Sequence, residues 1–269
     1  MAQIRFVRPN QTLPVSLTGK SCALQCAHCA GHYLSGMVPI EEADAEGKAS
    51  CLISGGCDGQ GRVPVTAHLQ QVAALRRGRM LNWHVGLIDE SEMQAIAPYV
   101  DVISFDWVGD DQTIREVYGL NCTTEGYART YAMLRRHARI VPHLTLGLRG
   151  GQFSGEYAAL DSMQALRVDA LVVLVFIPTP GTRYARCQPP ALAEVDDFLL
   201  AARCKLPDAS IHLGCMRPGG RYRRELDPLA VRAGVHKIVN PAPSAVRLAA
   251  ELGLSVRWEN ECCVIQRSS

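Results

Sequence analysis

Short β-rich runs alternate with helical segments along the whole chain, and this alternation restricts the fold more than any other feature of the sequence. Runs of apolar and β-branched residues predict strands at VSLT (15–18), SCLIS (50–54), LNWHVG (81–86), DVISF (101–105), IVPHLTLGL (140–148), ALVVLVFI (170–177), SIHLGC (210–215) and HKIVN (236–240). Segments with apolar residues at i, i+3 and i+4 spacing predict helices between them, at 65–78, 90–99, 124–138, 155–166, 190–203 and 244–253. Repeated strand–helix units imply parallel strands joined by right-handed crossovers.

The predicted fold is therefore α/β. Eight candidate strands favour a closed (β/α)8 barrel of the TIM type, and an open six-stranded three-quarter barrel is the alternative. A length of 269 residues suits a single barrel. Because no linker, low-complexity tract or repeat interrupts the chain, we expect one domain over residues 1–269, with a C-terminal extension (254–269) that carries Cys262 and Cys263.

Composition excludes several classes of protein. A net charge of +2 gives no electrostatic reason to expect nucleic acid or an anionic membrane as a partner. The chain has no run of 18 apolar residues, and its start, MAQIRFVRPNQ, lacks the apolar core of a signal peptide. We expect a soluble cytoplasmic protein, in which the eleven cysteines are reduced and serve metal ligation or burial rather than disulfides.

Three cysteines stand close together near the start of the chain. Cys22, Cys26 and Cys29 form a C-x3-C-x2-C triplet in CALQCAHC. A tetrahedral zinc site needs four protein ligands, whereas a [4Fe-4S] cluster held by three cysteines leaves one iron free for another molecule. The alternatives are half of a zinc site, completed by His28, His32 or a distant cysteine, or no site at all.

In spacing, and in its place after a predicted strand and turn (VSLTGKS, 15–21), the triplet resembles the signature of the radical SAM superfamily. The resemblance implies a [4Fe-4S] cluster and S-adenosylmethionine, which binds the open iron through its amino and carboxylate groups. Electron transfer then cleaves the sulfonium to a 5′-deoxyadenosyl radical, and the protein positions this cofactor chemistry. His28 stands where the family usually has an aromatic residue.

Active sites of such barrels lie at the carboxyl ends of the strands, and a glycine turn follows the second predicted strand there. Ser54, Gly55 and Gly56 form this turn, in which glycine lets the backbone approach a ligand closely. The family resemblance implies that the turn binds the amino group of S-adenosylmethionine. The alternative is a simple turn.

Two later loops are further candidates for the cofactor site. Arg149, in GLRGGQFSGE (147–156), is the natural partner for the cofactor carboxylate, because guanidinium binds carboxylate in a bidentate fork. Pro180 and Gly181, in FIPTPGTRY (176–184), resemble the loop that lines the adenine in the family. The alternatives are a surface arginine and a rigid turn.

A second set of cysteines lies at strand ends and near the C-terminus. This set comprises Cys51, Cys57, Cys215, Cys262 and Cys263. Strand-end cysteines should point to the barrel mouth or lumen, so we expect a second iron-sulfur cluster whose bridging sulfide is consumed as a sulfur donor, as in biotin synthase and lipoyl synthase. Which of the five are ligands stays open, as do an electron relay, a zinc site and no metal.

Three runs resemble the smaller subunit of the two-component (class II) lipoyl synthases: residues 16–37, 50–64 and 212–220, the last reading HLGCMRPGG. The resemblance implies a sulfur-insertion enzyme that converts octanoyl-lysine to lipoyl-lysine together with a second radical SAM protein. Its partners would be an octanoylated protein or peptide and an electron donor such as ferredoxin or flavodoxin. The alternatives are another radical SAM reaction, such as biotin-synthase-like cofactor assembly, and a non-catalytic iron-sulfur or zinc-binding assembly protein.

Overall fold

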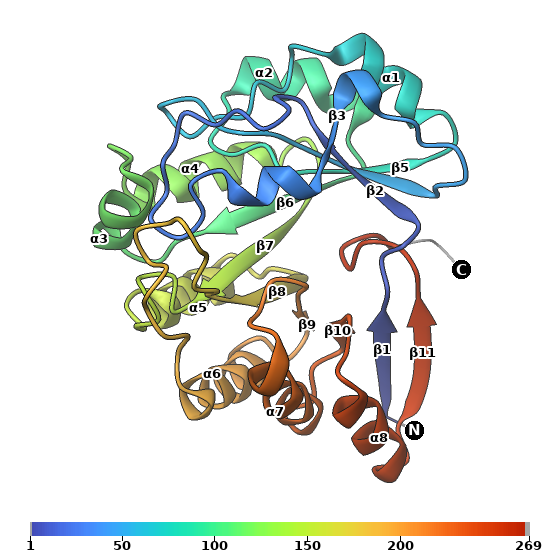
Figure 1. Ribbon diagram of the computed structural model, residues 1–269, viewed down its shortest axis with the longest axis vertical. Coiled ribbons are helices and arrows are strands. Elements are labelled where there is room, and N and C mark those ends of the chain that lie inside the picture. The colour runs from blue at the N-terminus through green and yellow to red at the C-terminus, as the bar shows by residue number, and fades with distance from the viewer. Residues whose placement is uncertain (1, 267–269) are drawn as a thin grey trace.

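A single, wholly parallel sheet organises the computed structural model, which describes residues 2–266 (Figure 1). Its order is β11-β1-β10-β9-β8-β7-β6-β5-β4-β2-β3, and each neighbouring pair is parallel. The strands are β1 (Gln3–Val7), β2 (Thr12–Ser16), β3 (Val38–Pro39), β4 (Ser50–Ser54), β5 (Met80–Trp83), β6 (Val102–Trp107), β7 (Arg139–Leu146), β8 (Ala170–Val175), β9 (Ser210–Leu213), β10 (Lys237–Val239) and β11 (Ser255–Glu259).

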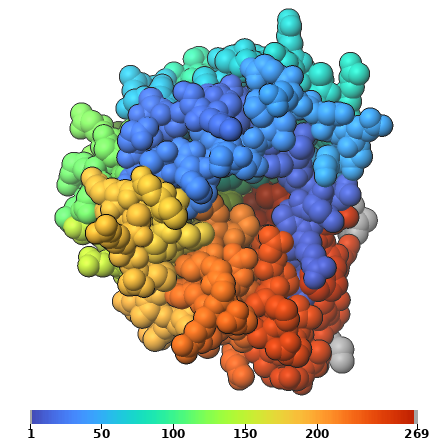
Figure 2. Space-filling model, viewed as in Figure 1, coloured from blue at the N-terminus to red at the C-terminus, as the bar shows by residue number. Residues whose placement is uncertain are grey.

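The α/β barrel fold is thus confirmed, in an open form. The edge strands β3 and β11 do not pair with one another among the described residues, so the sheet curls without closing. Figure 2 shows the surface hollowed between the N-terminal segments and those that follow β9. All eight predicted strands are present, and β1, β3 and β11 are additional.

Helices cover the outer face of the curled sheet (Figure 1). They are α1 (Leu69–Arg76), α2 (Glu90–Ile96), α3 (Asp111–Thr113), α4 (Thr124–Leu134), α5 (Glu156–Ala165), α6 (Leu192–Lys205), α7 (Gly220–Arg232) and α8 (Pro243–Glu251), with short helical turns η1 (His32–Gly36), η2 (Ile40–Glu42), η3 (Ala97–Tyr99) and η4 (Ile114–Tyr118). The sequence did not predict α7, whose exposed face carries arginines and which contains Pro228. No described helix has both the length and the apolar character needed to cross a membrane.

Each strand divides its side chains between two cores, because successive residues point to opposite faces. On β8, Leu171 and Val173 pack against the helices, whereas Ala170 and Val172 face the lumen. The outer cluster is the larger and holds the helices to the sheet. The inner cluster fills the base of the lumen and leaves the carboxyl ends of the strands open.

The C-terminal segment completes the base of the barrel. Cys263, Val264 and Ile265 are buried against inward-facing valines of the strands. The ammonium group of Lys237 donates a hydrogen bond to the Cys263 carbonyl at 3.1 Å, and Arg139 donates to the Val264 carbonyl at 3.1 Å. Residues of the predicted C-terminal extension are therefore part of the barrel interior, where their carbonyls give a further acceptor to two cations that also pair with Glu259 and Asp169.

A buried ion pair fixes the turn after β9. Arg217 donates two hydrogen bonds to the carboxylate of Asp227, both at 2.8 Å, and both side chains are 0% exposed. Arg217 also donates to the Gly214 carbonyl at 2.6 Å, and Asp227 accepts from the Ala242 N–H at 2.7 Å. The pair therefore ties the end of β9 to α7 and to the start of α8.

We expect Asp227→Ala to lower the free energy of unfolding by about 3–5 kcal/mol, because it leaves the guanidinium of Arg217 buried without its counter-ion. Glu225→Ala on the same helix is the matched control. Glu225 pairs with Arg221 in an exposed i,i+4 ion pair, so its loss should cost less than about 1 kcal/mol. Urea denaturation of both variants measures the difference, and equal values would contradict this reading of the pair.

Candidate functional site

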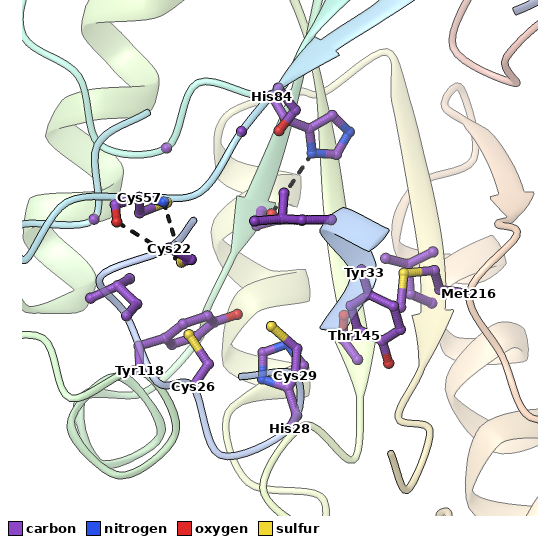
Figure 3. A pocket seen from close by; sticks show the side chains of 18 of the residues that line it. Cys22, Cys26, His28, Cys29, Tyr33, Cys57, His84, Tyr118, Thr145 and Met216 are labelled. Atoms are coloured by element: carbon purple, nitrogen blue, oxygen red, sulfur yellow. Dashed lines mark hydrogen bonds and ion pairs between the residues drawn. The ribbon is translucent and has the colours of Figure 1, made fainter. Parts of the chain in front are cut away.

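A pocket of about 300 Å³ opens at the carboxyl ends of the strands (Figure 3). Its floor comes from the strand ends and their continuations: Ser54, His84, Asp106, Thr145 and Val175. Its largely apolar walls include Leu24, Leu34, Leu87, Leu120, Phe176 and Ile177. The carboxyl ends of parallel strands are where ligands of α/β barrels bind, and this volume is at the small end of ligand pockets.

The cysteine triplet forms one wall of this pocket. Cys22, Cys26 and Cys29 all line it, from the loop between β2 and η1. The loop turns tightly around them, since the Cys29 N–H donates to the Cys26 carbonyl at 3.1 Å and Ala30 has a φ of 44°, in the left-handed region.

The thiols of Cys26 and Cys29 influence one another. A hydrogen bond between them raises the pKa of Cys26, with burial adding to the rise, and lowers the pKa of Cys29 to about 7. Within residues 2–266, no three His, Cys, Asp or Glu side chains converge closely enough to hold a single metal ion. The zinc alternative therefore gains no support from this geometry. A polynuclear cluster spreads its thiolate ligands over several metal atoms and needs no such point of convergence.

His28, between two of the cysteines, carries a buried ring nitrogen without a partner. Its Nδ1 has no hydrogen bond within the described part of the chain, and its ring meets Tyr118 edge-on at 5.7 Å. Burial lowers the pKa of His28 to about 4, so the ring is neutral near pH 7. A buried polar atom without a partner is costly, so this nitrogen fits a site that gains a further group when it is filled.

The glycine turn after β4 has a different role at each of its residues. Ser54 and Gly55 line the pocket, as expected for a ligand-binding turn, whereas Gly56 does not. A Cβ on Gly56 would lie 1.9 Å from the Ser21 carbonyl oxygen and 2.6 Å from the Cys22 Cα. Gly56 is therefore required where two loops of the chain touch, rather than for approach to a ligand.

Arg149 does not line the pocket. Its guanidinium Nε donates to the carboxylate of Glu116 at 2.7 Å, and the hydroxyl of Tyr184 donates to the same carboxylate at 2.8 Å. The expected role of Arg149 as a carboxylate ligand for the cofactor has no support in this position, because its charge is already paired with a neighbouring acid.

Pro180 and Gly181 also lie away from the pocket, on the surface. The loop reaches the pocket instead through Phe176 and Ile177. A hydrogen bond of 3.0 Å between the hydroxyls of Tyr33 and Thr179 connects this loop to η1. The sequence thus indicated a loop that reaches the pocket, and the cofactor-binding roles of Pro180 and Gly181 stay predictions.

The second set of cysteines is divided among three places. Cys51 points to the helix-covered face of β4, where burial raises the pKa of its thiol to about 11, so it is turned away from both pocket and lumen. Cys57 lies beside the triplet. Cys262 and Cys263 lie at the base of the lumen. A hydrogen bond with Cys262 and burial raise the pKa of Cys263, and the charges of Cys262 and Cys215 add to the rise.

Cys262 is the most polar of the lumen cysteines. Its sulfur accepts a hydrogen bond from the amide of Asn82 at 3.5 Å. The thiol of Cys263 also donates a hydrogen bond to this sulfur. This hydrogen bond, with a smaller effect of Asn82, lowers the pKa of Cys262 to about 6. Cys215 is accessible to solvent. The protein nevertheless surrounds its thiol, and this enclosure raises the pKa of Cys215, with the charge of Cys262 adding to the rise.

Three polar residues of the lumen were missed by sequence reasoning. Nδ1 of His84 lies 3.9 Å from a carboxylate oxygen of Asp106, and the His84 ring meets that of His143 at 5.3 Å. Enclosure alone would raise the pKa of Asp106, but its interaction with the His84 ring outweighs enclosure, and the pKa is lowered. The signal was available, because these residues occupy inward positions near the carboxyl ends of β5, β6 and β7.

Comparisons with known proteins agree with the fold. No family model and no curated protein matches the chain. Among solved structures, it is similar to methylornithine synthase (PylB), with 14% identity, a TM-score of 0.67 and coverage of 95% of this chain and 84% of that one. It is also similar to the FeFe-hydrogenase maturase HydG from Carboxydothermus hydrogenoformans, with 14% identity, a TM-score of 0.63 and coverage of 99% and 64%.

A third similar structure was solved with a bound cofactor. It is Streptococcus suis SuiB bound to S-adenosylmethionine, with 13% identity, a TM-score of 0.55 and coverage of 81% of this chain and 52% of that one. The chain therefore spans less than two thirds of HydG and about half of SuiB. At these identities the likeness establishes a shared barrel fold.

We expect Gly56→Ala to separate the glycine turn from the cysteine loop, because the added methyl group would overlap the Ser21 carbonyl. The variant should retain less iron after anaerobic reconstitution and should unfold at a lower temperature. Gly59→Ala is the matched control, since it lies three residues further on and a Cβ there would meet nothing within 4 Å. Iron content equal to that of the unaltered protein in the Gly56 variant would show that the contact is dispensable.

Proposed function

We propose that this protein is a radical SAM enzyme whose cluster is bound by Cys22, Cys26 and Cys29. One observation carries the proposal: three thiols on a single tight loop face a pocket at the carboxyl ends of parallel barrel strands. The donor set of three soft thiols, beside a partnerless buried nitrogen of His28, fits an iron-sulfur cluster with an open position. A barrel fold shared with SuiB, which was solved with S-adenosylmethionine, supports the same conclusion.

When bound, the cluster supplies the electron that cleaves S-adenosylmethionine to a 5′-deoxyadenosyl radical. The chain's own residues would bind the cofactor and shield the reacting centre from water. Ser54 and Gly55, which line the pocket, would hold the polar end of the cofactor through their backbone groups. Apolar walls such as Leu120 and Phe176 keep water from the reacting centre, where it would otherwise compete.

For the substrate, we propose an octanoyl chain on a lysine of a protein or peptide. The apolar walls suit an unactivated alkyl chain, and the three runs that resemble the smaller lipoyl synthase subunit include the cysteine loop, the glycine turn and the segment that ends with Gly220. The reaction would be sulfur insertion, as one half of a two-protein lipoyl synthase. Another radical SAM reaction, such as biotin-synthase-like cofactor assembly, is the alternative outcome of the test.

The sulfur source in this proposal is a second iron-sulfur cluster in the lumen. Cys215 and Cys262 are its best-placed candidate ligands, with Cys263 adjacent, because they lie together and Cys215 is accessible from the hollow of the barrel. One sacrificial cluster provides one sulfur, so lipoyl formation would require a second radical SAM protein. An electron donor such as ferredoxin or flavodoxin, and a location in the reducing cytoplasm, complete the proposal.

Replacing Cys26 by Ala should abolish reductive cleavage of S-adenosylmethionine, because the cluster loses one of three ligands. Anaerobic incubation with dithionite, followed by chromatography of 5′-deoxyadenosine, measures the effect. Cys204→Ala is the control, since Cys204 is exposed on α6, and it should cleave at the unaltered rate. Sustained 5′-deoxyadenosine formation by the Cys26 variant would remove the triplet from the mechanism.

Sulfur insertion is tested with an octanoyl-lysine peptide, S-adenosylmethionine and a reductant, with and without the partner protein. Mass spectrometry should show a mono-thiolated octanoyl group from this protein alone and lipoyl from the pair. Cys215→Ala should still cleave the cofactor but transfer no sulfur. Cleavage without any thiolation, in protein with a full complement of iron, would favour the alternative reaction.

A further inference from the structure

A fourth cysteine stands beside the triplet, on a different loop. Cys57 follows the glycine turn and lines the same pocket as Cys22, Cys26 and Cys29 (Figure 3). Its backbone N–H donates to the sulfur of Cys22 at 3.4 Å. The sequence grouped Cys57 with Cys215 and Cys262, because all three follow strands or lie near the C-terminus, but the structure places it against the first set.

Hydrogen bonds on both sides of Cys57 hold the two loops against one another. The Ala23 N–H donates to the Cys57 carbonyl at 2.8 Å, and the Gly56 N–H donates to the hydroxyl of Thr18 at 2.7 Å. The missing side chain of Gly56 lets the backbone of Cys22 lie directly against the turn. Held on both sides, Cys57 has little freedom to swing toward the cysteines of the lumen.

The thiol of Cys57 also acts electrostatically on the triplet. Burial, followed by the charge of Cys22 and by smaller effects that include Cys29, raises the pKa of Cys57 to about 12. The charge of Cys57 in turn raises the pKa of Cys26. Four sulfur atoms therefore share one wall of one pocket, although three are sufficient for the proposed cluster.

We propose that Cys57 is an exchangeable fourth ligand, which caps the open iron of the cluster until S-adenosylmethionine displaces it. The inference rests on the proposed function. In the exchange, the iron–sulfur bond to Cys57 would break, and the thiolate would take up the proton that the ammonium group of S-adenosylmethionine loses when its nitrogen binds iron. The amino nitrogen and a carboxylate oxygen of S-adenosylmethionine then bind the same iron. The exchange involves no change of oxidation state and needs no further reactant.

The cap has a chemical use. A four-iron cluster held by only three thiolates loses its least-protected iron on oxidation, whereas four thiolates hold all four irons. A capping thiol would protect the cluster while the cofactor is absent and would yield to it when it arrives.

The experiment compares reconstituted protein with Cys57→Ser and with the control Cys122→Ser, both without S-adenosylmethionine. Cys122 is half-buried beside α4 and does not line the pocket. After mild oxidation with ferricyanide, electron paramagnetic resonance reports the three-iron cluster. We expect Cys57→Ser to lose one iron in four and show this signal, while the unaltered protein and the control keep all four irons. Prior addition of S-adenosylmethionine should suppress the loss in Cys57→Ser.

Serine at position 57 could itself bind the iron and hide the loss of the cap. The affinity of a Cys57→Ala variant for S-adenosylmethionine provides a second test that avoids this. Cys57→Ala removes the competing ligand, so it should bind S-adenosylmethionine several-fold more tightly than the unaltered protein. Equal iron loss in the unaltered protein and Cys57→Ser, together with unchanged affinity in Cys57→Ala, would overturn the cap. Failure of the proposed function is a separate result: the unaltered protein would then hold no four-iron cluster, or would hold zinc bound by four sulfurs.

Discussion

The parallel direction of every strand is the constraint on which the rest of this structure depends. Because all strands run the same way, their carboxyl ends meet at one rim, and residues as distant in sequence as Cys22 and Met216 line one pocket. An antiparallel arrangement would have sent alternate strand ends to opposite rims. The chemistry of the site is therefore a consequence of topology, and each loop contributes a wall because it follows a strand.

The polar side chains of the lumen destabilise the fold unless they are hydrogen-bonded. Asn82, Ser104 and His143 are buried where apolar residues would be more stable, since buried polar groups must find partners. The structure supplies some of them in a chain: Ser104 donates to the Asn82 carbonyl oxygen at 3.0 Å, and the Asn82 amide reaches the sulfur of Cys262. The C-terminal segment thus completes the hydrogen bonding of the lumen, and this explains why a short tail with two cysteines lies inside the barrel.

The strands that the sequence predicted share one property: each carries a strong local pattern of apolar and β-branched residues. β11 was missed because it is exposed and its sequence, SVRWE, has no buried face to create such a pattern. For some of the predicted site residues, the sequence could not show the direction in which the side chain points. Cys51 lies on the face of β4 opposite to Ser50. Side chains alternate between the two faces of a strand, but the sequence alone does not show which alternate set faces the lumen until the register is known. The ion pair of Arg149 could not be predicted, because its partner, Glu116, lies 33 residues away in the chain and no local pattern joins them.

The electrostatics of the pocket favour a cation. Asp106 keeps its charge because His84 lowers its pKa. His28 and His143 do not offset this charge, since burial lowers the pKa of each to about 4 and leaves both rings neutral near pH 7. The thiol of Cys29, with its pKa near 7, adds partial negative charge. S-adenosylmethionine, the proposed cofactor, carries a sulfonium and an ammonium group, which the carboxylate of Asp106 would attract even though His84 is paired with it at 3.9 Å, and the low dielectric of the enclosed barrel would strengthen the attraction. The same field disfavours an anionic substrate near Asp106 and is compatible with a neutral acyl chain, which can lie along the apolar walls without meeting the carboxylate.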